Sequence, residues 1–361
     1  MTDPDLSAQR LDTIRGLAED TGAGAAVVSR AADVRWAVGF TGSNGLLVVS
    51  EGAAHFATDG RYTEQAAEEV SGAEVSVAPG ALAAFAGAEG WLAGARRVAF
   101  QAEHVTVAEF EKLEAAVPSA EWVPVQDLLA EAVASKTEAE VAAVARAQAA
   151  TCAVFEEVIP LIRPGLTERD LAAEIVHRHL RRGASAMAFE PIVAAGPRGA
   201  LPHARPSDAE IQAGDLVVID MGGVFDGYCS DLTRTVAVGE PSGEARRAYG
   251  VVRDAQRAAI DAAHAGTTGR ALDAVARDVI EAAGLGEAFS HSLGHGVGID
   301  VHEWPRLSKQ VEHVLPAGAT VTIEPGVYLA GRFGVRIENV VALREGGCDD
   351  LTPLPTDLVV L

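Results

Sequence analysis

Residues 214–239 read GDLVVIDMGGVFDGYCSDLTRTVAVG. Two runs rich in β-branched residues flank a turn of Gly and Asp residues, a pattern that predicts a β-hairpin. A hairpin centred on Phe225-Asp226 places Asp220 directly opposite Asp231. Side chains that face each other in this way have Cβ atoms about 4.5–5.5 Å apart, so two bare carboxylates there repel each other. A cation bound between them removes the repulsion.

A second stretch repeats the pattern, because residues 320–343 read TVTIEPGVYLAGRFGVRIENVVAL. A turn centred on Gly331 places Glu324 opposite Glu338. Pro325 has no N–H to donate to a ladder, so we expect a strand end or a bulge beside Glu324. Two divalent cations would balance the charge of four inward-facing acids.

One imidazole joins these acids. Residues 291–298 read HSLGHGVG, a glycine-rich run in which His295 is the natural ligand. Carboxylate-rich sites suit Mn, Mg or Ca, and an added imidazole shifts the preference towards Mn, Co, Fe or Zn. The alternative is that the acids are ordinary solvated strand ends. The apolar runs that flank them indicate buried strands and favour the metal site.

Six short motifs occur in order along the chain: 219–222 (IDMG), 227–235 (GYCSDLTRT), 294–298 (GHGVG), 301–306 (VHEWPR), 322–326 (TIEPG) and 335–338 (VRIE). Together they resemble the creatinase/aminopeptidase metallopeptidases, the pita-bread family. Within that family the chain most resembles the Xaa-Pro dipeptidases, or prolidases. The resemblance covers essentially the whole chain, because residues 36–43 (WAVGFTGS) and 58–62 (TDGRY) are similar to the family's N-terminal domain.

The resemblance implies an α+β fold with two domains. Residues 1–127 would form a smaller α/β creatinase-like N-terminal domain, and residues 128–361 a pita-bread catalytic domain with a pseudo-twofold repeat. The sequence pattern agrees, because strands and helices alternate in the first part and a helix–helix–hairpin pattern occurs twice in the second. Helices are expected at about 6–21, 137–162, after Thr167, and near 243–263 and 268–284.

The resemblance also implies a ligand set. Asp220 would bind one metal ion, His295 and Glu324 the other, and Asp231 and Glu338 would bridge both. The expected cofactor is two divalent ions, Mn first, with Co, Zn or Fe as alternatives. Two such ions hold a bridging hydroxide that attacks the peptide carbonyl. Glu324 would be the catalytic group that carries the proton to the leaving nitrogen.

Further residues are expected around the substrate. By resemblance, His203 and His302 would be catalytic residues that bind the substrate and stabilise the oxyanion. His291 is either a substrate-binding residue or a structural histidine. Arg306 would bind the free carboxylate of a dipeptide with its guanidinium fork, the alternative being a surface arginine in a loop. Arg336 would brace a metal-bound carboxylate from behind.

Other positions carry their own expectations. His177 and His179 lie two positions apart on a predicted helix, so they face different directions and are expected to be solvated. Asn339 departs from the family pattern, because relatives commonly have an acid after the last metal ligand. The proline slot of the substrate pocket has three candidate aromatic side chains, each of which could instead be core: Phe225, Tyr228 and Trp304.

These residues predict a hydrolase that cleaves the Xaa-Pro bond of dipeptides. The X-Pro bond is a tertiary amide with a rigid ring, which demands a slot of its own. The nearest alternative is an aminopeptidase P, which acts on Xaa-Pro-Yaa and longer peptides. From a different class of function, the chain could be a catalytically silent pita-bread binding module.

Composition limits the partners. A net charge of −22 at pH 7 repels phosphate backbones and anionic lipid, which disfavours nucleic-acid and membrane partners. The expected partners are a small peptide substrate that contains proline and, by resemblance, a second copy of the chain in a homodimer. The 3 cysteines lack CxxC spacing, and the N-terminus lacks a basic-then-apolar signal, so we expect a cytoplasmic protein with reduced thiols.

Overall fold

The computed structural model describes residues 4–361, and the chain divides into two compact units. The N-terminal unit ends at Val133, and the C-terminal unit is Ala134–Leu361. The sequence pattern placed the division a few residues earlier, after residue 127. Leu128 and Leu129 are buried and belong to the N-terminal unit, so the division falls within the short helix α6 (Ala130–Ala134).

The N-terminal unit is built on a six-stranded mixed sheet with the order β4-β3-β2-β1-β5-β6. The central strand β1 pairs antiparallel with β2 and parallel with β5, and all its residues are buried, as its apolar sequence AAVV requires. The strands are β1 (Ala25–Val28), β2 (Gly45–Ser50), β3 (Ala54–Asp59), β4 (Glu74–Ala78), β5 (Arg97–Gln101) and β6 (Glu121–Val125). The other helices are α1 (Pro4–Asp20), α2 (Ala31–Val38), α3 (Thr63–Glu69), α4 (Leu82–Ala88) and α5 (Val107–Ala116).

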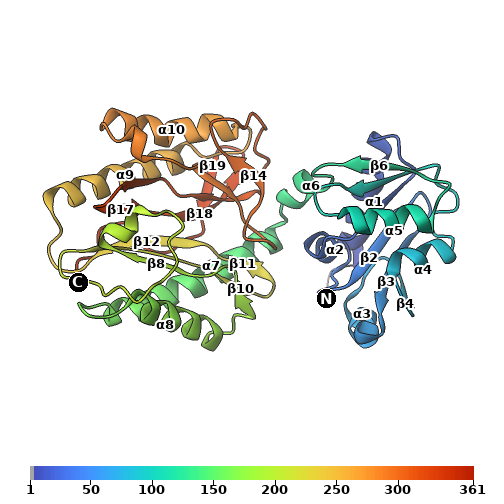
Figure 1. Cartoon of the computed structure of the whole chain (residues 1–361). Helices are drawn as coiled ribbons and strands as arrows, with labels where there is room; N and C mark the ends of the chain where they lie inside the picture. Colours follow the sequence, from blue (N-terminus) through green and yellow to red (C-terminus); the bar gives the residue numbers. More distant parts are fainter. Residues whose placement is uncertain (1–3) are drawn as a thin grey trace. The chain divides into compact units, whose positions relative to one another are not determined.

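In the C-terminal unit, Figure 1 shows strands that lie between two helix pairs, α7 with α8 and α9 with α10. Capping boxes or single side-chain caps begin these helices, as at Thr167, whose hydroxyl accepts from the N–H of Asp170. The helices are α7 (Glu138–Val158), α8 (Glu168–Arg181), α9 (Gly243–Ala262) and α10 (Gly269–Ala282).

The strands of this unit fall into two halves that each follow one helix pair, which is the expected repeat. The first half holds β7 (Ala186–Met187), β8 (Ile192–Ala195), β9 (Leu216–Met221), β10 (Gly223–Phe225), β11 (Tyr228–Cys229) and β12 (Leu232–Ala237). The second holds β13 (Gly294–Gly296), β14 (Glu303–Leu307), β15 (Thr320–Ile323), β16 (Gly326–Leu329), β17 (Phe333–Arg336), β18 (Asn339–Arg344) and β19 (Gly347–Asp350).

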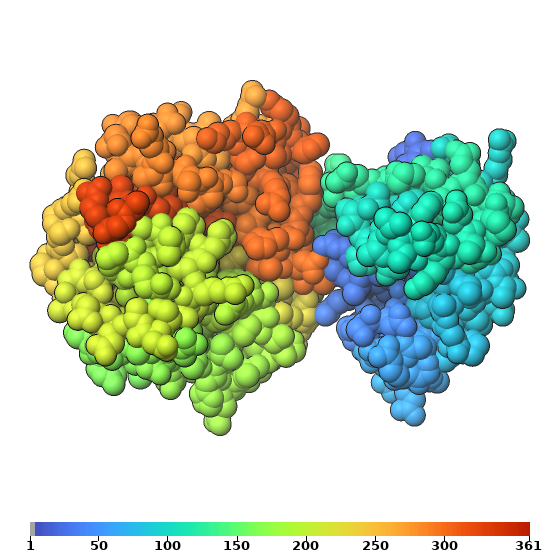
Figure 2. All heavy atoms as spheres, in the orientation of Figure 1, coloured from blue at the N-terminus to red at the C-terminus, as the bar shows by residue number. Residues whose placement is uncertain are grey.

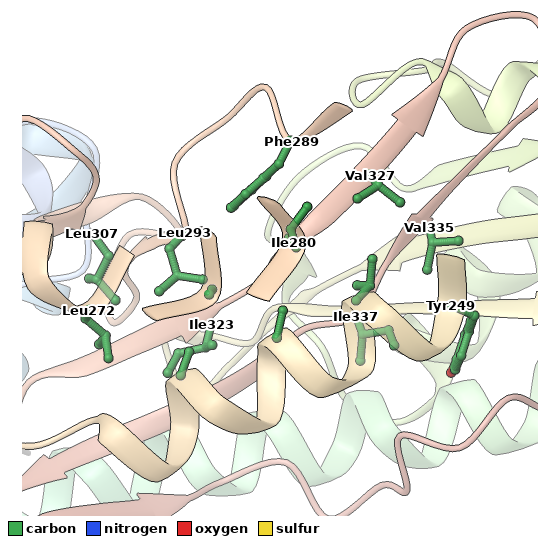
Figure 3. Close-up of a cluster of buried hydrophobic side chains, with 14 of the residues drawn as sticks. Tyr249, Leu272, Ile280, Phe289, Leu293, Leu307, Ile323, Val327, Val335 and Ile337 are labelled. Atoms are coloured by element: carbon green, nitrogen blue, oxygen red, sulfur yellow. The ribbon is translucent and has the colours of Figure 1, made fainter. Parts of the chain in front are cut away.

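Apolar side chains join the second helix pair to the second set of strands. Figure 3 shows Leu272 and Ile280 from α10 in one cluster with Ile323 and Val335 from the strands and Ile337 from the segment between β17 and β18. All five side chains are buried, and burial of such residues contributes about 1.5–3 kcal/mol each. None of the helices within residues 4–361 combines the length and apolarity needed to cross a membrane.

The first hairpin has a different register from the one expected. Its turn is Asp226-Gly227, where both residues have positive φ, 49° and 75°, as a type I′ turn requires. Phe225 instead pairs with Tyr228 in the ladder. This one-residue displacement of the turn moves the partner of Asp220 from Asp231 to Thr233. The prediction that the two aspartates are directly opposed is therefore wrong.

The two halves meet along β12 and β17. The hydroxyl of Thr235 donates to the carbonyl of Arg336 at 3.0 Å and accepts from its N–H at 3.1 Å. The N–H of Glu338 donates to the carbonyl of Thr233 at 3.1 Å. This seam brings residues about a hundred positions apart in the sequence into one site.

Candidate metal centre and substrate pocket

Acids from both halves of the C-terminal unit gather at this seam. Asp220 lies on β9, and Asp231 immediately precedes β12. Glu324 lies between β15 and β16, and Glu338 lies between β17 and β18. Together with His295 on β13, they line one pocket of about 440 Å³.

The second hairpin has the expected register. Glu324 and Glu338 lie opposite each other in the gap between two ladders that share one register. Pro325 interrupts the strand beside Glu324, so the prediction of a strand end there is confirmed. The pairs that flank the gap are Ile323 with Asn339 and Gly326 with Arg336.

Three of the five side chains already lie at metal-binding distances from one another. Ligand atoms of Asp231, His295 and Glu338 all lie within 4.8 Å of one another. Nε2 of His295 is 3.6 Å from Oδ2 of Asp231 and 3.4 Å from Oε1 of Glu324. Nδ1 of His295 lies 3.0 Å from the carbonyl of Gly296, which turns Nε2 towards the acids.

Burial shapes the charge of this cluster. Burial, followed by the neighbouring carboxylates, raises the pKa of Asp231 and of Glu338 well above their ordinary values. Burial also raises the pKa of Asp220, and it raises that of Glu324 to about 7. The same desolvation lowers the pKa of His295 to about 4, so its imidazole is neutral at pH 7. A bound divalent cation would favour the charged form of these carboxylates, and carboxylates with a neutral imidazole are a donor set that divalent metals bind.

Asp220 supplies a separate test of whether cations fit this site. Its Oδ2 accepts a hydrogen bond from Nη2 of Arg336 at 2.7 Å. Its Oδ1 is buried and has no hydrogen-bond partner among residues 4–361. An anionic oxygen left in this way is costly, and a bound cation would remove the cost. The residues present therefore fit divalent metal ions.

Arg336 connects two of the carboxylates with the hydroxyl of Tyr328. Besides Asp220, it donates from Nε to the hydroxyl of Thr233 at 3.1 Å and from Nη1 to the hydroxyl of Tyr328 at 2.9 Å. The hydroxyl of Thr233 in turn donates to Oε2 of Glu338 at 2.9 Å. One guanidinium therefore orients carboxylates from both halves of the unit.

His291 reaches the pocket, but both of its ring nitrogens have partners in the protein. Nδ1 lies 2.8 Å from the carbonyl of Ser292, and Nε2 lies 2.8 Å from the hydroxyl of Tyr328. Burial lowers its pKa to about 4. The Tyr328 hydroxyl, which accepts from Arg336, can donate to Nε2 of a neutral His291. This arrangement favours the structural alternative for His291.

Asn339 has a clear structural role. Its Oδ1 accepts a hydrogen bond from Nη2 of Arg234 at 3.0 Å, and its Nδ2 donates to Oδ2 of Asp350 at 2.7 Å. Nη1 of Arg234 donates to the backbone carbonyl of Glu338. An amide group accepts a hydrogen bond through its oxygen and donates one through its nitrogen, whereas an ionised carboxylate can only accept.

The remaining predicted substrate residues also line the pocket. His203 comes from the loop before β9, His302 precedes β14, and Arg306 lies on β14 opposite His295. The imidazoles of His302 and His295 have centroids 4.3 Å apart. Figure 2 shows the yellow-green segment before β9 at the surface near the orange segment that carries His302.

A family model, Metallopeptidase family M24, matches residues 142–345. The chain belongs to metallopeptidase family M24. A second model, the Creatinase/Prolidase N-terminal domain, matches residues 10–132. This M24 peptidase is therefore a hydrolase in which a creatinase-type N-terminal domain precedes a pita-bread domain, as predicted.

Similar proteins share nearly the full length of this M24 peptidase. An uncharacterized peptidase, YqhT, from Bacillus subtilis is 38% identical over 98% of this chain and 100% of its own. The structure of an Xaa-Pro dipeptidase from Bacillus anthracis has a TM-score of 0.96 and 34% identity, and the match covers 98% of this chain and 100% of that one. The structure of an X-Pro aminopeptidase from Thermotoga maritima has a TM-score of 0.88 and 36% identity, with 95% and 99% covered.

Several features of the M24 peptidase pocket were not predicted. The pocket wall includes Phe189, Glu190 and Arg205, from loops without a periodic pattern. The contact of the Tyr328 hydroxyl with Arg336 was also not predicted, although both residues lie in the same hairpin. Among residues 4–361, the pocket lining does not include any of the three aromatic candidates for the proline slot. Its apolar part comes instead from Phe189, Pro191, Ile192, Pro202, Ala204 and Pro206.

Two helix histidines differ from each other. His177 is exposed, as expected, but His179 is completely buried, so the prediction that it is solvated was wrong. Its Nε2 lies 3.0 Å from the hydroxyl of Thr151, and its Nδ1 lies 2.9 Å from the carbonyl of Ile175. His179 is thus a satisfied core residue outside the pocket lining.

Proposed function

We propose that this M24 peptidase is an Xaa-Pro dipeptidase that uses two divalent metal ions. The observation that carries the proposal is the set of three buried carboxylates, the half-buried carboxylate of Glu324 and a neutral imidazole, which lines a pocket together with Arg306. The similarity to an Xaa-Pro dipeptidase over nearly the whole chain supports the substrate class.

The metal ions would be held by both halves of the unit. Asp220, Asp231, His295, Glu324 and Glu338 are the proposed ligands, and Mn is the expected metal because oxygen ligands dominate, with Co, Zn or Fe as alternatives. When bound, divalent ions lower the pKa of a water molecule and polarise the scissile carbonyl. Arg336 and Thr233 would keep the carboxylates in place for this purpose.

Glu324 is the proposed proton carrier. Its side chain is 17% exposed, against 6% for Asp231, so it can reach a substrate in the pocket. In the chain without metal ions, burial raises the pKa of Glu324 to about 7, so its carboxylate takes up a proton more readily than an exposed glutamate does. Its carboxylate would take a proton from the attacking water and, as the carboxylic acid, pass that proton to the prolyl nitrogen, which becomes the leaving amine.

His203 and His302 would stabilise the carbonyl oxygen as negative charge develops on it. Both line the pocket beside the acids. Burial lowers the pKa of His302, which keeps its imidazole neutral with one N–H to donate. Donors placed in advance at such an oxygen are worth about 2.7–4 kcal/mol each.

Arg306 would bind the carboxylate of the substrate. A dipeptide Xaa-Pro presents its carboxylate one residue beyond the scissile bond, and a guanidinium matches it with two hydrogen bonds. Arg306 is exposed and lines the pocket. Arg205 also lines the pocket, but its Nε lies 3.7 Å from Oε2 of Glu190.

A second candidate is an aminopeptidase P, which the similarity to an X-Pro aminopeptidase favours. The variant Arg306→Ala separates the two. For a dipeptidase, it should raise KM for Met-Pro far more than KM for Ala-Pro-Ala, with Arg205→Ala as the matched control. Equal effects of Arg306→Ala on both substrates would contradict carboxylate binding by Arg306.

The homodimer, the cytoplasmic location and the lack of nucleic-acid or membrane partners stay predictions from the sequence. Sedimentation of the purified protein tests the first. A single species of monomer mass would contradict it.

A further inference from the structure

A buried ion pair lies beside the pocket and has no place in the proposed reaction. Nζ of Lys136 donates a hydrogen bond to Oε1 of Glu303. The two side chains are only 3% and 6% exposed. Lys136 is the second residue before α7, and Glu303 is the first residue of β14. Both belong to the C-terminal unit.

The backbone around this pair leaves room for it. A Cβ atom on Gly298 would lie 2.6 Å from Oε1 of Glu303 and 2.6 Å from Cε of Lys136. A Cβ atom on Gly318, whose φ is +81°, would lie 2.5 Å from the carbonyl oxygen of Lys136. Any side chain at either position would push into the pair or its backbone. Segments from three parts of the chain are therefore shaped around one contact.

Glu303 lies between two pocket residues, His302 immediately before β14 and Arg306 on it. It pairs with Gly296 in the ladder, whereas Arg306 pairs with His295, the next residue of β13. The extra residues on β14 form a bulge, which loosens the pairing between these two points. His302 immediately precedes Glu303, and its imidazole packs against that of His295. An anchor at Glu303 therefore controls where His302 lies.

The other side of this loop is held separately. The N–H of Cys229 donates to the carbonyl of Gly298 at 2.7 Å, and the N–H of Gly298 donates to the carbonyl of Asp300 at 2.9 Å. These bonds fix the beginning of the loop. The end of the loop, at Glu303, is held by the ladder pairing with Gly296 and by the ion pair with Lys136.

We propose that Lys136 is a positioning residue, which acts through Glu303 to hold His302 against the metal-ligand His295. The inference rests on the proposed function, because His302 is taken as a substrate-binding group. Apolar replacement of a buried ion pair is often neutral for stability, so stability alone does not account for the pair. A role in placing a group that acts on the substrate accounts for the ion pair, because a displacement of about 1 Å can cost about a hundredfold in rate.

The first test compares Glu303→Gln and Lys136→Met with the wild type in their Mn-loaded forms. Glu303→Gln keeps the shape of the side chain, so it carries the test if Lys136→Met does not fold. Each variant should lower kcat for Met-Pro about tenfold to about a hundredfold, while metal content by elemental analysis stays equal to wild type. Unchanged kcat in a folded variant, or loss of metal in proportion to activity, would overturn the proposal.

The matched control is Asp33→Asn in the N-terminal unit. Asp33 is also buried and accepts from the side chain of Gln101. This variant removes a buried charge far along the chain from the pocket residues, so it should lower the melting temperature and leave kcat unchanged. A fall in kcat as large as that of Glu303→Gln would show that the loss reflects general destabilisation.

A double-mutant cycle asks whether the pair acts through His302. If it does, Glu303→Gln should reduce kcat in the wild type but have little further effect in a His302→Ala background. Multiplied effects of the two substitutions would overturn the proposal, because they would mean that Glu303 acts elsewhere.

A readout without catalysis separates this inference from the proposed function. In protein labelled with 15N-histidine, the ring signals of His302, assigned by their loss in His302→Ala, should shift or broaden in Glu303→Gln and not in Asp33→Asn. Unchanged His302 signals would overturn the positioning role. The His302 signals can be read even if the protein cleaves no Xaa-Pro bond. A lack of cleavage would contradict only the proposed function and not the positioning role of Lys136.

Discussion

Arg336 donates a hydrogen bond of 2.7 Å to Oδ2 of Asp220, whose Oδ1 is buried and, within residues 4–361, has no hydrogen-bond partner. The guanidinium thus orients the carboxylate and leaves one oxygen for a cation. Outer partners of this kind set the direction of a ligand and are worth about tenfold to about a hundredfold in metal affinity.

The variant Arg336→Met should therefore weaken metal binding. It removes the donor to Asp220 and also the donors to Thr233 and Tyr328, so the carboxylates of both halves lose their orientation. We expect the Mn affinity, measured by titration calorimetry, to fall about tenfold to about a hundredfold. The control is Arg344→Gln, which removes an arginine that pairs with Glu138 and Asp349, and it should leave the Mn affinity unchanged. Equal affinity of Arg336→Met and wild type would contradict the role of Arg336.

Asn339→Asp should destabilise the C-terminal unit. The new carboxylate would keep the hydrogen bond from Arg234 but would face Asp350 at the 2.7 Å now bridged by an amide hydrogen. Loss of this bond costs about 1 kcal/mol, and the repulsion between the acids should weaken in high salt. The double variant Asn339→Asp/Asp350→Asn restores one amide to the pair. Calorimetric melting that shows no recovery in the double variant would contradict this account of Asn339.

His179 should make the protein less stable in weak acid. Burial lowers the pKa of His179 in the folded state, whereas an imidazole in the unfolded chain titrates near about 6.5. As the pH falls, the unfolded state therefore binds a proton before the folded state does. The contribution of the neutral His179 to the free energy of unfolding is fully present above about pH 6.5 and is lost as the pH falls below that value. His179→Gln should flatten the fall in melting temperature as the pH drops below about 6.5. His177→Gln, on the exposed side of the same helix, serves as the control, and identical slopes for both variants would sink the assignment.

The gathering of the five proposed ligands in one pocket could be predicted from the sequence because the segments that carry them follow local patterns. The second hairpin has a turn residue, Gly331, that both ladders share, so its register and the opposition of Glu324 and Glu338 followed directly. The first hairpin was harder, because several glycines and aspartates compete for the turn. Positive φ at Asp226 and Gly227 decided the matter, and no periodicity of the flanking strands reveals that choice.

Long-range contacts explain what the sequence could not show. Phe189 and Arg205 reach the pocket from loops, whose conformations carry no repeating pattern. His179 looked like an ordinary polar position on a helix, and only the packing of Thr151 against it makes it a core residue. The contact between Lys136 and Glu303 joins residues 167 positions apart, and neither lies in a pattern that points to the other.

Hydrolysis of Met-Pro beside Ala-Pro-Ala, each with Mn and with an excess of chelator, tests the central claim most directly. A dipeptidase with metal ions at the five proposed ligands should cleave Met-Pro with Mn, lose that activity with chelator, and cleave the tripeptide poorly. Cleavage of Met-Pro that survives complete metal removal, or cleavage of neither peptide with Mn bound at the site, would contradict it.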